Sequence, residues 1–463
     1  MKKFAFLSWA VVAALFFTAC GSSPKGYSVV DGVIVFDAPA RVEGQHSVLR
    51  LTTDPIPVVR VGFIGLGMRG PGAVERFTYL DGVEIKALCD LYPDRVEKSQ
   101  EILAGRNLPA AAAYSGEEGW KELCRRDDID LVYICTPWQL HVPMAVYAME
   151  HGKHVAVEVP AAMSLEECWQ LVDTAEKTQR HCMMLENCCY DFFEMATLNM
   201  ASRGLFGEVM HVEGAYIHDL RSLNLDTADR TGYQGMWRLD YNTRHTGNPY
   251  PTHGLGPVCQ ILGIHRGDRM ERLVSLSTAQ RGLTLAAREK FGPDSQWAQR
   301  DYRLGDMNTT LIRTARGKTI LIQHDVTSPR PYNRLHTISG TKGFAQKYPV
   351  ETIALDPNAH APLPERQRDS LLSIYEHPIT REIGEKARQV GGHGGMDFIM
   401  DYRLIYCLRN GLPLDMDVYD AAEWSSLVEL TEASAEHGGM PVLVPDFTRG
   451  AWDKVKGFSH AVK

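Results

Sequence analysis

Residues 58–70 read Val58-Val59-Arg60-Val61-Gly62-Phe63-Ile64-Gly65-Leu66-Gly67-Met68-Arg69-Gly70. The first seven form a short run rich in β-branched residues, which predicts a buried strand. Three glycines in G-x-G-x-x-G spacing follow directly, and a helix is expected to begin there. A strand that passes through such a turn into a helix is typical of a domain that binds a dinucleotide.

Each glycine of this turn has its own expected role. Gly65 permits the tight turn, Gly67 lets the backbone approach a pyrophosphate, and Gly70 lets helix and strand pack closely. The helix N-terminus adds N–H donors and positive potential. Asp90 ends the next predicted strand, where a carboxylate binds the ribose hydroxyls of NAD and repels the 2′-phosphate of NADP. The alternative is a glycine-rich turn that holds no ligand.

Strand and helix patterns continue to alternate after this unit. A helical stretch at 142–150 lies among further apolar, strand-like runs at 83–90, 130–135, 155–158 and 183–187. Such alternation predicts an α/β fold with a doubly wound parallel sheet. We therefore expect a Rossmann domain for NAD over residues 57–189.

The rhythm changes beyond residue 190, where longer β-type segments appear at 208–218, 272–279, 310–315, 319–327, 335–339 and 344–347. Turns such as Arg316-Gly317-Lys318 separate consecutive runs, which is typical of antiparallel strands. Two helical stretches, 396–409 and 420–437, follow. Residues 190–463 are thus predicted to form an α+β substrate-binding domain on an open, mainly antiparallel sheet, which offers an interface for a homo-oligomer.

The N-terminus has the features of a targeting segment. Lys2 and Lys3 precede an apolar run at 4–17, which ends in Thr18-Ala19-Cys20. Small residues before a cysteine resemble a bacterial lipobox, so residues 1–20 are expected to be a signal peptide and Cys20 the lipidated residue. An ordinary cleaved signal or a short anchor is the alternative. We expect an exported lipoprotein, held by this anchor on a membrane of a bacterial cell envelope, with 21–56 as a lead into the first domain.

Composition excludes several other classes. The chain has 463 residues, a net charge of -8 and a pI near 6.1, so a nucleic-acid partner is not expected. It contains no CxxC pair and no HExxH, so neither a metal site nor a regular disulfide framework is predicted. Cys89 and Cys135 lie inside apolar runs and are interpreted as buried thiols, and packing is the expected explanation for the adjacent Cys188 and Cys189.

Three motifs resemble the Gfo/Idh/MocA oxidoreductases: 136–141 (Thr-Pro-Trp-Gln-Leu-His), Gly152-Lys153-His154-Val155 and Glu158-Val159-Pro160. In most of that superfamily the middle residue of the last motif is a lysine that works at the reacting carbon. Here it is Val159, and an aliphatic side chain cannot transfer a proton. A simple dehydrogenase therefore lacks its usual acid/base group.

More specific motifs resemble glycoside hydrolase family 109, at 186–190, Trp237-Arg238, 247–254 and 393–397. That family removes terminal α-linked N-acetylgalactosamine with the help of NAD. The resemblance implies cofactor contacts at Met68, Arg69, Asp90, Trp138, Gln139, Leu140, His141, Glu158, Val159, Asn187 and Tyr250. It implies sugar contacts at Tyr216, Arg238, Tyr250, Pro251, Thr252, His253 and Tyr332.

Several of these residues have a plainer alternative. His141 starts a helix and would serve equally as a cap or a buried polar group. Tyr216 lies on an alternating strand, where a core position is an equal possibility, and Tyr332 follows a Pro-Arg-Pro segment, where it would simply be exposed. His393 and Asp397 share helical spacing, which suits a cap as well as a catalytic pair. His253 is the strongest candidate, because it sits in a polar loop between Pro251 and glycines.

The resemblance implies a redox-neutral cycle. The sugar's C3 hydroxyl is oxidised, the C2 proton is removed, the C1 group leaves, water adds, and C3 is reduced again with retention. His253 is our candidate for the C3 hydroxyl proton, with Tyr216 or Tyr332 acting at C2 or binding the sugar. A redox-neutral cycle also suits an exported enzyme, which has no pool to recycle NADH. The alternatives are an exported NAD-dependent sugar oxidoreductase and an NAD-containing binding protein.

Overall fold

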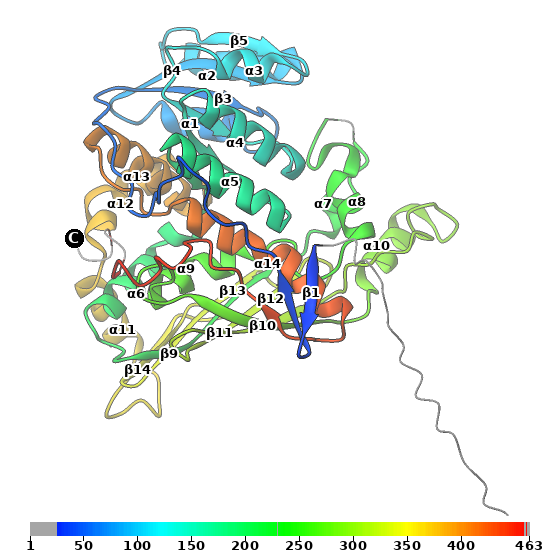
Figure 1. Ribbon diagram of the computed structural model, residues 1–463, viewed down its shortest axis with the longest axis vertical. Helices are drawn as coiled ribbons and strands as arrows, with labels where there is room; N and C mark the ends of the chain where they lie inside the picture. The colour runs from blue at the N-terminus through cyan, green and yellow to red at the C-terminus, as the bar shows by residue number, and fades with distance from the viewer. Residues whose placement is uncertain (1–25, 229, 458–459, 461–463) are drawn as a thin grey trace, which may run out of the picture.

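The computed structural model describes residues 26–228, 230–457 and 460. Two sheets form its framework: a six-stranded parallel sheet in the upper part of Figure 1 and a ten-stranded sheet in the lower part. Residues 1–25, which include the predicted signal peptide and Cys20, lie outside the described residues.

The parallel sheet confirms the predicted doubly wound fold. Its order is β5-β4-β3-β6-β7-β8, and every neighbouring pair is parallel. The strands are β3 (Val59–Ile64), β4 (Val83–Asp90), β5 (Ala112–Ser115), β6 (Leu131–Ile134), β7 (His154–Val157) and β8 (Cys182–Met184). The helices between them are α1 (Gly70–Phe77), α2 (Pro93–Gly105), α3 (Gly119–Cys124), α4 (His141–Glu150) and α5 (Leu165–Thr178). All six strands end at one edge, where ligands bind in such sheets.

The ten-stranded sheet confirms the predicted second sheet and extends it. Its order is β1-β2-β16-β10-β11-β12-β9-β13-β14-β15, with β12/β9 and β16/β2 parallel and the other pairs antiparallel. Its main strands are β9 (Val209–Ile217), β10 (Met270–Ser277), β11 (Asn308–Thr314), β12 (Thr319–Asp325), β13 (Asn333–Gly340), β14 (Gly343–Gln346) and β15 (Thr352–Leu355).

One part of the predicted lead is a sheet element. Strands β1 (Tyr27–Val30) and β2 (Val33–Phe36) form a hairpin around Asp31-Gly32, and β2 pairs with β16 (Val442–Leu443). This hairpin, blue in Figure 1, forms one edge of the ten-stranded sheet. An Asp-Gly turn between alternating residues is a hairpin signal, but strands of four residues carry little pattern by which to recognise them.

Helix α14 (Val418–Glu436) lies between the two sheets, where it contacts α5 and β8 on one side and β10 on the other. Its N-terminus is fixed by a capping box of Asp417 and Asp420. Most of the helix is buried, including all of Trp424. The predicted closing helix is therefore the core element that joins the domains.

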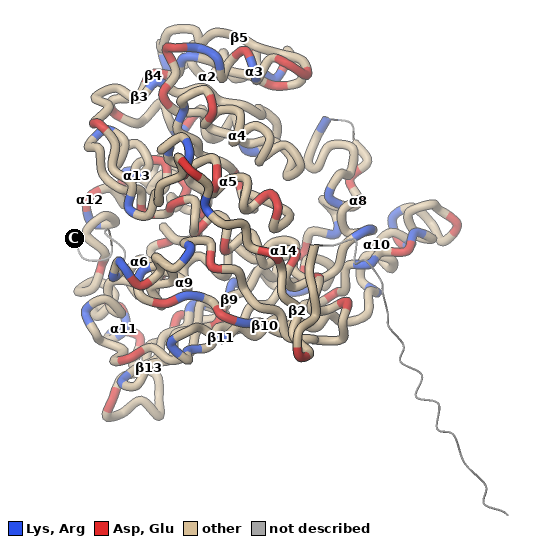
Figure 2. The backbone as a smooth tube through the Cα atoms, in the orientation of Figure 1, with Lys and Arg blue, Asp and Glu red and all other residues tan. Residues whose placement is uncertain are grey.

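The remaining helices flank these layers: α6 (Phe192–Ser202), α7 (Arg221–Asn224), α8 (Trp237–Arg244), α9 (Thr252–Leu262), α10 (Gly282–Phe291), α11 (Glu365–Ile374), α12 (Pro378–Val390) and α13 (Met396–Asn410). Basic and acidic residues are interspersed along both domains (Figure 2). Within the described part of the chain, no helix combines the length and apolar character needed to cross a membrane.

The glycine turn generates a stability prediction. A Cβ on Gly70 would overlap the carbonyl oxygen of Gly65, whereas a Cβ on Gly72 would meet only Arg76 Nη1, at 3.5 Å. We expect Gly70→Ala to lower the free energy of unfolding by about 1–3 kcal/mol, the usual cost of overpacking. Gly72→Ala, in the same helix, should be neutral or stabilising by up to about 1 kcal/mol. Equal unfolding midpoints in a denaturant titration of the two variants would contradict this packing argument.

Candidate functional site

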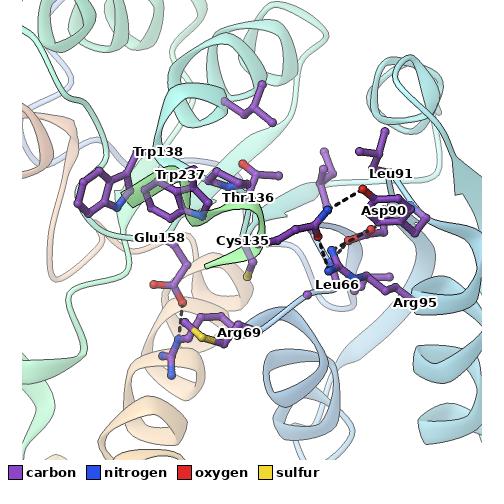
Figure 3. Close-up of a pocket in the computed structure, with 18 of the residues that line it drawn as sticks. Leu66, Arg69, Asp90, Leu91, Arg95, Cys135, Thr136, Trp138, Glu158 and Trp237 are labelled. Carbon is purple, nitrogen blue, oxygen red and sulfur yellow. Dashed lines mark hydrogen bonds and ion pairs between the residues drawn. The ribbon is translucent and has the colours of Figure 1, made fainter. Parts of the chain in front are cut away.

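A cavity of about 810 Å³ opens at the carboxyl edge of the parallel sheet. Asp90 and Arg95 lie at one end, and Trp138, Trp237, Glu158 and Arg69 lie at the other (Figure 3). The predicted residues that line it are Gly65, Gly67, Met68, Arg69, Asp90, Trp138, Gln139, Leu140, His141, Glu158, Val159, Arg238 and Tyr250. The structure thus brings most of the predicted cofactor residues to one elongated cavity.

The Asp90 end is built for a ribose beside a phosphate group. Asp90 Oδ2 accepts a hydrogen bond from Leu66 N at 2.6 Å, and Oδ1 accepts one from Tyr92 N at 3.0 Å. These bonds hold the carboxylate against the glycine turn. Helix α1 has no side-chain cap, so its first N–H groups face the turn without such a partner. The residues present fit an NAD molecule, with Asp90 at the adenosine ribose and the α1 N-terminus at the pyrophosphate.

The opposite end is an aromatic cage around one guanidinium. Arg238 lies 4.6 Å from the ring centroid of Trp138, 4.7 Å from that of Tyr250 and 4.9 Å from that of Tyr233. Its side chain is buried, and its Nη2 has no hydrogen-bond partner among the described residues. A buried donor of this kind is costly unless a ligand accepts from it. Arg238 is therefore suited to bind a polar group of a substrate, as predicted.

His253 forms a dyad with Glu186, a residue that was not predicted to belong to the site. His253 lies in the first turn of α9, and its Nδ1 is 2.7 Å from Glu186 Oε1. Burial favours the neutral carboxyl, but the charge and hydrogen bond of His253 lower the pKa of Glu186. The carboxylate therefore orients the imidazole. Glu186 follows β8 at the ligand-binding edge, and that position was the signal available in the sequence.

The other predicted substrate residues surround His253. The ring of Tyr216 lies 4.6 Å from that of Tyr250 and 5.4 Å from that of His253, measured between centroids. Tyr332 is 38% exposed and accepts a hydrogen bond from Arg334 Nη1 at 3.1 Å. Tyr216 is almost fully buried, but its hydroxyl contacts His218, so it is a core residue with a polar function. This cluster adjoins the cavity through Tyr250 and Arg238.

Some predicted residues have supporting positions. The ring nitrogens of His141 lie 2.8 Å from the carbonyl oxygens of Thr136 and Pro160. Burial lowers the pKa of His141, so its neutral ring donates a hydrogen bond to only one of these carbonyls. Thr252 is buried beside Glu186, after Pro251, which precedes α9. Asn187 donates to Asp397 Oδ1 at 2.5 Å instead of lining the cavity.

His393 and Asp397 form a pair that reaches the cofactor cavity through Arg69. His393 Nδ1 is 2.9 Å from Asp397 Oδ2, to which Arg69 Nη2 donates at 3.2 Å. Arg69 also donates to Glu158 Oε1 at 3.1 Å. Although burial opposes ionisation, His393, Arg69 and Arg76 lower the pKa of Asp397. The pair thus anchors helix α13 to the glycine turn.

One cluster has the spacing of a metal site. Glu186, Cys188 and His253 each offer a ligand atom, and these atoms lie within 4.8 Å of one another. Burial raises the pKa of the Cys188 thiol, which favours the protonated thiol over the thiolate that a metal ion binds. Glu186 Oε1 and His253 Nδ1 are already bonded to each other at 2.7 Å. The geometry therefore favours a proton-transfer dyad over a metal centre.

Solved structures with the same fold include sugar and polyol dehydrogenases. Levoglucosan dehydrogenase in complex with NADH and levoglucosan matches with a TM-score of 0.61 and 17% identity, covering 84% of this chain and 99% of that one. Scyllo-inositol dehydrogenase from Lactobacillus casei with NAD(H) and scyllo-inositol matches with a TM-score of 0.59, 12% identity and the same coverage. At these identities the likeness shows the fold alone.

Sequence comparison identifies the family. The model "Oxidoreductase family, NAD-binding Rossmann fold" matches residues 59–186, and "Glycosyl hydrolase 109, C-terminal domain" matches residues 190–454. A Bacteroides fragilis protein named alpha-N-acetylgalactosaminidase is 59% identical, covering 89% of this chain and 97% of that protein. A Porphyromonas gingivalis glycosyl hydrolase family 109 protein is 54% identical, covering 99% and 98%. The chain therefore belongs to glycosyl hydrolase family 109 and carries an NAD-binding Rossmann domain of the Gfo/Idh/MocA type.

Proposed function

We propose that the protein hydrolyses terminal α-linked N-acetylgalactosamine in a redox-neutral cycle that uses NAD. The observation that carries this proposal is the state of the carboxylates around the site. Glu186 pairs with His253, Glu158 with Arg69, and Asp397 with Arg69 and His393. Paired-carboxylate glycosidases need one carboxylic acid with a raised pKa, whereas the pKa values of Glu186 and Asp397 are lowered. Proton transfer falls instead to histidine and tyrosine.

The side chains divide the work of the cycle between them. Bound NAD supplies reversible oxidation of the sugar's C3 hydroxyl. His253, oriented by Glu186, takes the proton of that hydroxyl and later returns it. Arg238 binds a polar substituent of the sugar, and the rings of Trp138 and Trp237, 4.9 Å apart between centroids, form an apolar wall of the cavity. Loss of the C2 proton expels the C1 group as an alcohol, and water then adds at C1.

A redox-neutral cycle also fits the proposed location. We propose that the protein is exported and anchored to a membrane of the cell envelope through lipid on Cys20, as the residues before Cys20 indicate. We further propose that copies associate through the open face of the ten-stranded sheet. That face exposes apolar side chains on three of its strands: Met210 on β9, Val274 and Leu276 on β10, and Leu311 on β11.

The cofactor assignment predicts a change of preference in Asp90→Ala. Loss of the carboxylate should weaken NAD binding and relax the discrimination against NADP, because the group that repels a 2′-phosphate is removed. Titration of apoprotein with each dinucleotide measures both effects. Glu97→Ala, which removes an exposed carboxylate on α2 that does not line the cavity, serves as the control and should retain the wild-type preference. An unchanged preference in Asp90→Ala would refute the assignment.

The proposed chemistry predicts hydrogen exchange at C2. In heavy water, N-acetylgalactosamine released from an α-glycoside should carry deuterium at C2, and NAD should be required without being consumed. Glu186→Gln should slow release by about 10²–10⁴-fold, because the amide no longer supports a cationic His253. Mass spectrometry of the product and NAD occupancy of the variant are the measurements. Hydrolysis without exchange would exclude the elimination, and net accumulation of NADH would favour the sugar oxidoreductase.

The proposed anchor predicts that Cys20→Ser releases the protein from the membrane fraction in the native host. A cysteine with two or more acyl chains binds a membrane firmly, whereas one chain binds only marginally. Cys188→Ser, at a buried thiol, is the matched control and should leave fractionation unchanged. Retention of Cys20→Ser in washed membranes would contradict a lipid on this residue.

A further inference from the structure

A second hydrogen-bonded pair lies beside the Glu186–His253 dyad. Tyr216 and His218 are two positions apart on strand β9 and just beyond its end, so their side chains share one face. The backbone N–H of His218 donates to the Asp325 carbonyl at 2.9 Å, which continues the pairing of β9 with β12. Tyr216 Oη lies 3.0 Å from His218 Nδ1. The strand backbone therefore holds the phenol against the imidazole.

The surroundings of the pair set the direction of proton transfer. Burial raises the pKa of Tyr216, which disfavours a free phenolate. Burial, with Arg238 and His253 nearby, lowers the pKa of His218, so the imidazole is neutral at neutral pH. His393 adds to this effect, whereas Asp219 opposes it and would stabilise the imidazolium once it forms. The ring centroid of Tyr332 lies 5.0 Å from that of His218.

We propose that His218 is the proton acceptor of Tyr216, and that the two side chains form the relay that removes the C2 proton. This inference rests on the proposed function. As Tyr216 Oη takes the proton from C2, its own proton moves to His218 Nδ1, so the phenol stays neutral throughout. The electron pair of the C2–H bond becomes the C1–C2 double bond, and the C1–O bond breaks. The leaving oxygen takes a proton from water, and His218 returns its proton to solvent.

The half-buried position of His218 suits this role. Tyr216 is only 7% exposed, so it has little direct access to solvent. Tyr216 Oη is bonded to His218 Nδ1 at 3.0 Å, whereas His253 Nε2 lies 3.5 Å from the hydroxyl of a different tyrosine, Tyr250. The structure thus offers two separate pairs for the two proton transfers, Glu186–His253 for the C3 hydroxyl and His218–Tyr216 for C2.

The test uses His218→Asn in the full-length, NAD-loaded protein. The asparagine amide oxygen can accept the hydrogen bond of Tyr216 but cannot take its proton. We expect kcat and the rate of C2 deuterium exchange to fall together by about 10²–10⁴-fold, with KM and NAD occupancy near wild type. Oxidation at C3 should persist, so reduced nicotinamide should accumulate in a single turnover and be visible by its absorbance. Added imidazole should restore part of the rate in His218→Ala.

His211→Asn is the matched control, because His211 lies on the same strand, bonded to Thr319 at the end distant from the site. The His211→Asn variant should exchange the hydrogen at C2 with solvent at the wild-type rate. Tyr216→Phe with His218→Asn should cost little more than either change alone, since both break one relay. Independently of turnover, nitrogen NMR of labelled histidine should show His218 with its proton on Nε2, and this signal should respond to Tyr216→Phe.

Two outcomes separate the relay from the function on which it rests. If the wild-type protein and His218→Asn exchange the C2 hydrogen with solvent equally fast, the relay is wrong and the glycosidase cycle stands. If wild type releases the sugar with no exchange, both proposals fail.

Discussion

Helix α9 meets strand β9 backbone to backbone, and the geometry of the site depends on this contact. A Cβ on Gly214 or on Gly254 would overlap the backbone of the other segment, so only glycine permits so close an approach. On its other side α9 approaches Glu186, whose Cγ would be 2.8 Å from a Cβ on Gly256. His253, at the start of this helix, is thereby placed between Glu186 of the parallel-sheet domain and Tyr216 of the ten-stranded sheet. The proton-transfer site exists only where the two domains meet.

Electrostatics at this junction follow from burial. A charge removed from water is tolerated when a partner and hydrogen bonds replace the solvent. Asp397 meets this condition through Arg69, Arg76 and His393, and in doing so it ties helix α13 to the cofactor turn. The buried charge of Arg238 is stabilised instead by the faces of aromatic rings, and one edge of its guanidinium remains available to a ligand. The same constraint that stabilises the domain junction therefore leaves few groups able to exchange protons.

Much of the fold was predictable from local pattern. The strand expected at 83–90 is β4 (Val83–Asp90), and the glycine turn joins β3 to α1 as expected. The β1–β2 hairpin was missed because its partner, Val442, lies near the other end of the chain. The central place of α14 was also not visible, because a helix buried on nearly all sides has no polar face to mark its orientation. In the site, the individual residues were predicted more successfully than the hydrogen bonds between their side chains.

The sequence by itself determined the two sheet types, the NAD-binding turn and thirteen of the residues that line the cavity. These follow from periodicity, glycine spacing and side-chain chemistry among neighbouring residues. Tertiary structure alone decided that Glu186 orients His253, that Asn187 bonds to Asp397, and that His141 lies between two backbone carbonyls. The partners in the first two of these contacts lie 67 and 210 positions apart in the chain. Local sequence pattern specifies on which face of its helix or strand a side chain lies. Only the packing of α9, α13 and α14 against the sheets determines which residues that side chain contacts.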